Sequence, residues 1–205
     1  MPVQNKYTSS DYFFQFVTVT AGVLIALLIN GLVEWNDDRV LVADARSTIA
    51  REIADNKKDL DATLGGLQED IKKLEMGIKF ANELLAKKST SVHQLNFGIN
   101  MADLSASGWR TAERTGALSH MDYDEVQRLS KLYDLQDVIV DQQRAFVSQL
   151  GDAMAILSSD FDPDKGNTRD LELFRERLMR LRSTLIIHSE IAKRLAENYA
   201  EMLKP

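Results

Sequence analysis

The pattern of apolar and charged positions divides the chain into a short apolar segment and a long amphipathic remainder. Residues 12–33 carry no charged side chain, and Asp11 and Glu34 flank them. As a helix rising 1.5 Å per residue, this run would extend about 33 Å and could cross a hydrocarbon core of about 30 Å. It is longer than the apolar region of a secretory signal sequence, which has about 7–15 residues, and it lacks a small-residue cleavage site. The pattern predicts a transmembrane helix over residues 12–34, preceded by a short N-terminal tail over residues 1–11.

In three further segments, residues that are mostly apolar recur at alternating spacings of three and four, so they form a stripe along one face of a helix. We call each of these stripes a seam. The first seam consists of Leu60, Leu64, Leu67, Ile71, Leu74, Ile78, Ala81 and Leu85. The second consists of Val126, Leu129, Tyr133, Gln136, Val140, Gln143, Val147, Leu150, Met154 and Leu157. The third consists of Leu171, Phe174, Leu178, Leu181, Leu185, His188, Ala192, Leu195, Tyr199 and Met202. Such seams must be covered by other helices, so we predict an all-α fold: the transmembrane helix continues into a long stalk helix and an antiparallel bundle of three to four helices.

The expected boundaries follow from these seams and from capping residues such as Asp122, which precedes Glu125 in a capping-box spacing. A stalk and bundle domain over residues 35–205 is expected to contain helices at about 35–88, 103–118, 123–158 and 169–203. The first helix is longer than its partners, so residues 35–52 are expected to form an unpacked stalk, and Gly65–Gly66 is a candidate kink. An up-down-up order would place residues 89–121 as an irregular cap at the distal end.

Composition excludes several classes of function. The net charge is −6 without a basic tail, which argues against a nucleic-acid partner. Cysteine is absent, so the chain has no thiolate metal site. The stretch DFDPDKGN resembles a calcium loop, but Lys165 and Leu171 stand where such a loop requires glycine at its sixth position and glutamate at its twelfth. No catalytic motif is present, and we expect neither a cofactor nor enzymatic activity.

Two stretches, GVLIALLINGLVEWNDDR and SGWRTAERTGALSHMDYDEVQRLSKLYDLQ, resemble an uncharacterised group of bacterial single-pass membrane proteins with helical domains. The resemblance implies an anchor in the bacterial inner membrane and a helical bundle, and it brings no known activity. Basic residues after the apolar run, taken literally, favour a cytoplasmic bundle. The resemblance and the acidic residues interleaved with those bases favour the periplasm.

A ladder of small or polar residues recurs every fourth position inside the apolar run: Thr18, Gly22, Ala26 and Asn30. Small residues allow membrane helices to approach closely, and an asparagine can hydrogen-bond between them. The ladder predicts association with a second copy or with another membrane protein. The alternative is that glycine and alanine are simply common in membrane helices.

The expected cap contains the best candidate for a ligand site, formed by Trp109, Arg110, Glu113 and Arg114. The indole offers a stacking surface, and two arginines four residues apart could hold a small anion. In the alternative interpretation, Trp109 closes the end of the core and the arginines pair with acidic residues. His188 occupies a seam position, where it is either a hydrogen-bonded core residue or a pH-responsive group. Gln136 and Gln143 in the second seam either satisfy His188 or set the register of the helices.

These observations favour a membrane-anchored helical interaction or scaffold module that oligomerises through its anchor. Its expected partners are the lipid bilayer and a second copy or another membrane protein. A sensor subunit that binds a small anion at the distal cap around Trp109 is the second hypothesis, and an unrecognised enzyme is the third.

Overall fold

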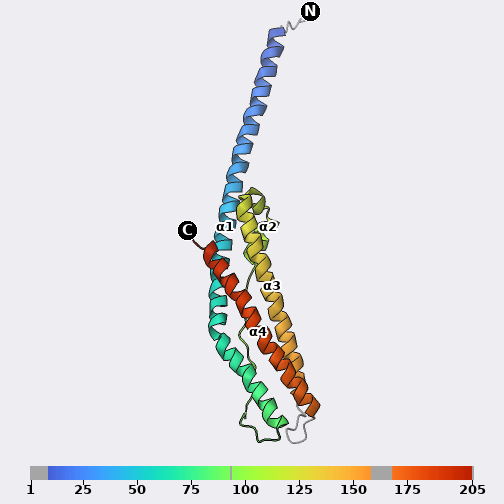
Figure 1. Ribbon diagram of the computed structural model, residues 1–205. Helices are drawn as coiled ribbons and strands as arrows, with labels where there is room; N and C mark the ends of the chain where they lie inside the picture. The colour runs from blue at the N-terminus through green and yellow to red at the C-terminus, as the bar shows by residue number, and fades with distance from the viewer. Residues whose placement is uncertain (1–8, 93, 158–167, 205) are drawn as a thin grey trace, which may run out of the picture.

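The computed structural model describes residues 9–92, 94–157 and 168–204, and this part of the chain contains helices and no strand. The elements are α1 (Ser9–Leu85), α2 (Ser107–Arg114), the 3₁₀ helix η1 (Ala117–His120), α3 (Tyr123–Met154), the 3₁₀ helix η2 (Ala155–Leu157) and α4 (Thr168–Met202). The helices α1, α3 and α4 form a bundle from which the first part of α1 extends alone (Figure 1). The predicted all-α class is confirmed. Residues 1–8 of the predicted tail and the stretch DFDPDKGN lie outside the described residues.

The helix α1 is continuous over 77 residues, so the predicted membrane segment and first bundle helix form a single element. Every side chain from Tyr12 to Asp37 is exposed. Among the described residues, α1 is the one helix that is long and apolar enough to cross a membrane. The Gly65–Gly66 pair leaves the helix uninterrupted, although α1 changes direction in its teal part (Figure 1).

The helices α1 and α3 run parallel, and α4 runs antiparallel to both. Contacts between α1 and α3 advance together along the two helices: Arg46–Glu125, Glu52–Tyr133 and Asn56–Gln136. Contacts between α1 and α4 advance in opposite directions: Glu75–Arg182 and Asn82–Arg175. The expected up-down-up order is therefore wrong, because the chain returns along the bundle before α3 begins.

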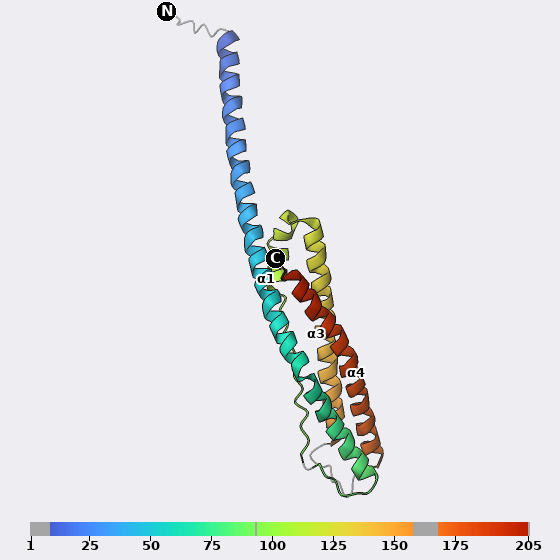
Figure 2. The same cartoon turned by 60° about the vertical axis from the view of Figure 1, so that its left-hand side comes forward.

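The return segment, residues 94–106, is extended and lies along α1 (Figure 2). It brings α2 and η1 back to the end of the bundle where the apolar helix leaves, so the expected distal position of Trp109 is wrong. The expected helix over 103–118 is also shorter, since α2 begins at Ser107. Hydrogen bonds from the Asn56 side chain hold the backbone of Ser105 outside the helix.

The unpacked stalk is much shorter than expected. Val42 is 6% exposed and Ile49 is 2% exposed, although both fall within the predicted stalk of residues 35–52. The returning α2 and η1 cover this part of α1, which the up-down-up order would have left bare. The bundle therefore begins about two turns after Trp35.

The seams of the first and third bundle helices are buried or half-buried as predicted, and the second fails at Val147 and misses the more deeply buried register beside it. Val147 is 55% exposed, whereas Phe146 is 1% exposed and Ile139 is 4% exposed. A seam through Leu132, Gln136, Ile139, Gln143, Phe146, Leu150 and Ala153 has the same alternating spacing and is the one that faces the other helices. Valine at 140 and 147 makes both registers look apolar, so spacing alone did not separate them.

Two glycines of α1 differ in the space around them and provide a matched pair of variants. A Cβ at Gly77 would lie 2.6 Å from Leu178 Cδ1 and 2.8 Å from Phe97 Cζ, whereas at Gly65 it would meet no described atom within 4 Å. We expect Gly77→Val to lower the free energy of unfolding by about 1–3 kcal/mol, because buried side chains must move. Gly65→Ala is expected to raise it by about 0.5 kcal/mol. Denaturant unfolding measures both, and a Gly77→Val variant as stable as the parent would contradict the packing.

Candidate functional site

A buried carboxylate, Glu52, joins α1 to α2 and α3 at the end of the bundle where the apolar helix leaves. Its residue is 8% exposed. The carboxylate accepts backbone N–H bonds from Gly108 at 2.8 Å and from Trp109 at 3.3 Å. Three hydroxyl groups also donate to it, from Ser105 at 2.9 Å, Ser107 at 3.0 Å and Tyr133 at 2.7 Å. Five donors therefore converge on one ionised side chain.

Glu52 acts as the N-terminal cap of α2 although it belongs to another helix. The first N–H groups of a helix have no partner within it, and Ala106 at the N-cap position of α2 provides no side-chain hydrogen bond. A carboxylate suits this place because a helix N-terminus carries partial positive charge. Glycine at 108 permits the approach, since a Cβ there would lie 3.1 Å from Thr48 Cγ2 and 3.2 Å from Glu52 Oε1.

A network of amides continues from this carboxylate into the core. Asn56 Nδ2 donates to the Ser105 carbonyl at 2.7 Å, and Asn56 Oδ1 accepts from the Ser105 N–H at 2.8 Å. Gln136 Nε2 donates to the same carbonyl at 2.9 Å, and Gln136 Oε1 accepts from Tyr199 Oη at 2.6 Å. The network therefore connects α1, α3, α4 and the return segment. The hypothesis that Gln136 satisfies His188 is wrong, because its amide serves these groups instead.

The protonation states of this network follow from burial and hydrogen bonding. Burial acts to raise the pKa of Glu52, but the bonds from Gly108, Tyr133 and the two serines outweigh it and hold the pKa below its ordinary value of 4.5. Burial raises the pKa of Tyr133, and the hydrogen bond to Glu52 raises it further. Burial also raises the pKa of Tyr199. At neutral pH the carboxylate is ionised and both phenols donate.

Polar side chains of α1 and α3 hold the rest of the return segment. Asp70, which is 2% exposed, accepts from the Asn100 N–H at 3.0 Å and from Lys73 Nζ at 2.8 Å. Lys73 Nζ also donates to the Gly98 carbonyl. The Gln143 amide faces the backbone of Ala102, with distances of 3.2 Å and 3.0 Å when its nitrogen donates to the carbonyl and its oxygen accepts from the N–H. Gln143, like Gln136, thus serves the return segment rather than His188.

The four predicted ligand residues lie on α2, beside the Glu52 junction. Trp109 stacks on Tyr133, with ring centroids 5.2 Å apart and an angle of 14° between the planes. Arg110 Nη2 lies 3.9 Å from Asp137 Oδ1. Glu113 and Arg114 are exposed. Trp109 therefore helps to close the end of the core, and the ligand hypothesis stays a prediction.

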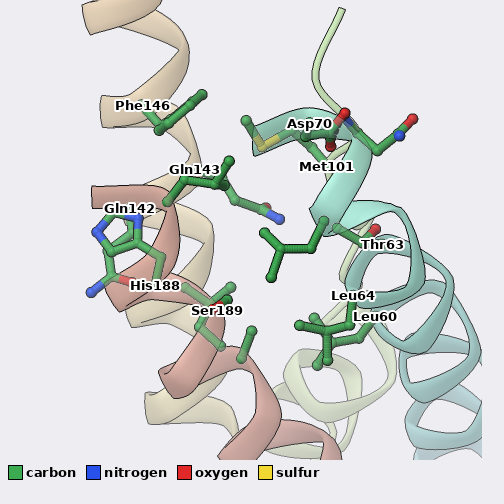
Figure 3. Close-up of a pocket in the computed structure, with 15 residues that line it drawn as sticks. Leu60, Thr63, Leu64, Asp70, Met101, Gln142, Gln143, Phe146, His188 and Ser189 are labelled. Carbon is green, nitrogen blue, oxygen red and sulfur yellow. Dashed lines mark hydrogen bonds between the residues drawn. The ribbon is translucent and has the colours of Figure 1, made fainter. Parts of the chain in front are cut away.

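A cavity of about 60 Å³ lies deeper in the bundle, between α1, α3 and α4. It marks the boundary between two apolar core clusters, since Leu60 and Ile139 on its wall belong to one cluster and Phe146 belongs to the other. His188 and Gln142 lie together at one edge, and Gln143 extends toward the centre (Figure 3). The volume is sufficient for a few water molecules.

The half-buried His188 gives the bundle a specific pH dependence. Burial lowers the pKa of His188 below its ordinary value of 6.5. The unfolded chain therefore binds more protons below that pH, and stability falls as the pH drops through this range. We expect His188→Gln to remove part of the decrease in Tm between about pH 7.5 and pH 5.5. Identical Tm profiles for parent and variant would show that another group is responsible.

The ladder of Thr18, Gly22, Ala26 and Asn30 lies on the exposed part of α1. The Thr18 hydroxyl donates to the Phe14 carbonyl at 2.9 Å, within its own helix. A Cβ added at Gly22 would meet no described atom within 4 Å. The ladder surface is therefore open in a single copy of the chain.

Sequence reasoning missed Glu52 and Asn56, the two residues of α1 that organise this junction. Both fall on the stripe that also contains Ile49, Ile53 and Leu60, so they are polar residues at core-facing positions of a helix. This pattern could have identified the two residues from the sequence, because a buried polar group must find hydrogen-bond partners.

The fold and the site define an all-α protein in which one long helix has an apolar, unpacked end and a buried polar junction with the bundle. No known protein family, curated protein or solved structure matches the chain. The family resemblance inferred from two sequence stretches therefore remains a prediction.

Proposed function

We propose that the protein is a single-pass, membrane-anchored helical interaction module that oligomerises through its anchor and has no catalytic activity of its own. The proposal assigns it to a bacterial inner membrane, with the bundle on the periplasmic side. The side is tested by a reporter enzyme fused after Pro205 that is active only in the periplasm. Activity of the fusion supports this orientation, and an inactive but expressed fusion contradicts it.

The observation that carries the proposal is the continuity of α1. About a third of this helix is apolar and contacts no other element of the described residues, while Ile49, Ile53 and Leu60 of the same helix are at most 2% exposed in the core. Thirteen Leu, Ile, Val or Phe residues between Phe13 and Val33 favour membrane insertion by about 4–8 kcal/mol. A single rigid element thus links a segment suited to lipid with a folded bundle suited to protein partners.

The direction of the ladder supports association between copies. Successive residues of an α-helix are rotated by about 100° around the helix axis. By this measure, the side of α1 that carries the ladder is rotated by about 150° from the side that faces the bundle, which carries Asp38, Val42, Ala45 and Ile49. Two anchors could therefore meet along the ladder with their bundles on the outer sides. Close packing across small residues is the usual basis for such contacts in lipid.

Gly22→Leu tests association through the ladder. The larger side chain would separate the two helix backbones, so we expect several-fold weaker chemical cross-linking between copies of the full chain in membranes. Gly31→Leu is the matched control, because Gly31 faces the opposite side of the same helix and is expected to leave cross-linking unchanged. Equal cross-linking in both variants and the parent would exclude the ladder as the contact.

A sensor of small anions is the second candidate function, and one observation favours it. Arg110 lines a surface hollow of about 390 Å³ next to the Glu52 junction, with Ser105, Ser107, Arg144 and two carboxylates, Asp137 and Asp141, that an anion would have to displace from the arginines. An anion held there would contact the same serines that donate to Glu52. Inorganic phosphate that raises the Tm of the parent but not of Arg110→Ala would support this function, and no difference between the two proteins would count against it.

A further inference from the structure

We infer that the tip of the bundle, residues 116–124, rests against the lipid headgroups of the bilayer that holds the anchor and forms a second membrane contact. The tip comprises Gly116, η1, the two residues that lead into α3, and the first two residues of α3, Tyr123 and Asp124. This inference rests on the proposed anchor and adds a surface on a different part of the chain. Its occupant is the headgroup layer of that same membrane.

The axial position of the tip is fixed by one contact with α1. His120 Nδ1 lies 3.3 Å from Asp38 Oδ2. Asp38 follows Val33, the end of the charge-free run, by five residues, which corresponds to about 7.5 Å along a helix. The headgroup layer is about 5–7 Å thick on each side of the hydrocarbon core. His120 is therefore level with the outer edge of the headgroups when the apolar run fills the core.

The tip cannot move away from the bilayer independently of the anchor. Arg46 donates to Glu125 through two bonds, from Nε at 2.8 Å and from Nη2 at 2.5 Å. Ala117 is fully buried and Met121 is 9% exposed, both in the cluster that contains Val42. These contacts attach the tip to α1 within about four turns of the apolar run, so the position of the anchor sets the position of the tip.

The exposed chemistry of the tip suits an interface between lipid and water. Tyr123 is 73% exposed, and its hydroxyl accepts a hydrogen bond from Gln127 Nε2 at 2.8 Å. On α1, Trp35 is 58% exposed and carries the Arg39 guanidinium 4.7 Å from its ring centroid. Tyrosine and tryptophan are enriched at the headgroup level of membranes. Trp35, two residues after Val33, lies within the headgroup layer, and Tyr123, three residues after His120, lies on the outer side of that layer.

The test measures how close a single tryptophan lies to lipid headgroups. The full chain is placed in phosphatidylcholine nanodiscs that contain a headgroup-labelled nitroxide lipid, which quenches nearby indole fluorescence. Zwitterionic lipid is chosen because Asp37 and Asp124 would repel an anionic surface. In a Trp35→Phe, Trp109→Phe background, Tyr123→Trp reports on the tip. Val147→Trp reports on an exposed site about 36 Å further along α3.

We expect quenching of the Tyr123→Trp protein to be at least twofold stronger than that of the Val147→Trp protein. Ser119→Trp provides a second tip position if the first variant does not fold, as judged by circular dichroism. A protein that keeps Trp35 alone reports on the anchor. Strong quenching of Trp35 with equally weak quenching at positions 123 and 147 overturns the tip contact and leaves the anchor standing. Weak quenching of Trp35 as well overturns both.

Discussion

Replacing Glu52 with Gln is expected to lower the free energy of unfolding at pH 7 by about 3 kcal/mol or more, the largest effect of any single conservative change in the bundle. The carboxylate accepts five hydrogen bonds in a site that is 8% exposed. Hydrogen bonds to a charged group contribute about 1.5–3 kcal/mol each, and a lost partner leaves buried donors unsatisfied. An amide has one acceptor oxygen, and its NH₂ group would face donors. Denaturant unfolding of the full chain measures the difference.

The same substitution is expected to change how stability depends on pH. The pKa of Glu52 in the folded chain lies below 4.5, so its contribution is complete above that value and is lost as the pH falls through the folded pKa. The difference in unfolding free energy between parent and Glu52→Gln should therefore shrink below about pH 4.5. Glu113→Gln, an exposed change on α2, is the control and should alter stability by less than about 0.5 kcal/mol. If the Glu52→Gln protein were as stable as this control, the hydrogen bonds of Glu52 would not contribute to the free energy of unfolding.

A double substitution in the apolar run, Leu24→Arg with Leu27→Arg, is expected to release the chain from the membrane. Arginine at the centre of a membrane helix costs about 2.5–3.5 kcal/mol, and each lost leucine removes a further favourable contribution of about 0.5 kcal/mol. The two changes together offset the whole estimated insertion energy of about 4–8 kcal/mol. The measurement is the fraction of protein that sediments with membranes after alkaline carbonate extraction.

The control for this experiment places the same charges on the bundle. Val138 and Val147 on α3 are 47% and 55% exposed, so Val138→Arg with Val147→Arg should leave the membrane fraction unchanged. If the chain with arginine at positions 24 and 27 stays resistant to carbonate, then α1 is not what holds the protein in the membrane.

Local patterns in the sequence predict much of this fold. The charge-free run, the seam from Leu171 to Met202 and the capping role of Asp122 each depend on residues within a few turns of one another. The Asp122 side chain accepts from the N–H groups of Asp124 at 3.0 Å and Glu125 at 3.2 Å, as the capping spacing predicted. The other half of the expected capping box is used differently, because Glu125 binds Arg46 of α1.

The candidate site was less accessible to prediction because it is made by contacts between distant parts of the chain. The sequence predicts a helix from residue 103, but contacts with α1 about 50 positions earlier place its start: Asn56 accepts from the Ser105 N–H, and Glu52 accepts from the N–H groups of Gly108 and Trp109. The direction of α3 depends on the same contacts. The spacing of apolar residues predicts which face of a helix is buried. It does not predict at which end of the bundle the segment that connects two helices ends.

The parallel arrangement of α1 and α3 has a consequence for the order of folding. Hydrogen bonds between these helices close loops of 79–81 residues, whereas the bond from Arg177 to the Asp152 carbonyl closes a loop of 25 residues. Loop-closure entropy favours the shorter loop. We therefore expect the hairpin of α3 and α4 to form first, with α1 docking last, and pulse-labelled hydrogen exchange should show early amide protection in α3 and α4. During synthesis, the core-facing side of α1 would remain uncovered until the last helix has emerged from the ribosome, which makes this stretch the natural target for a chaperone.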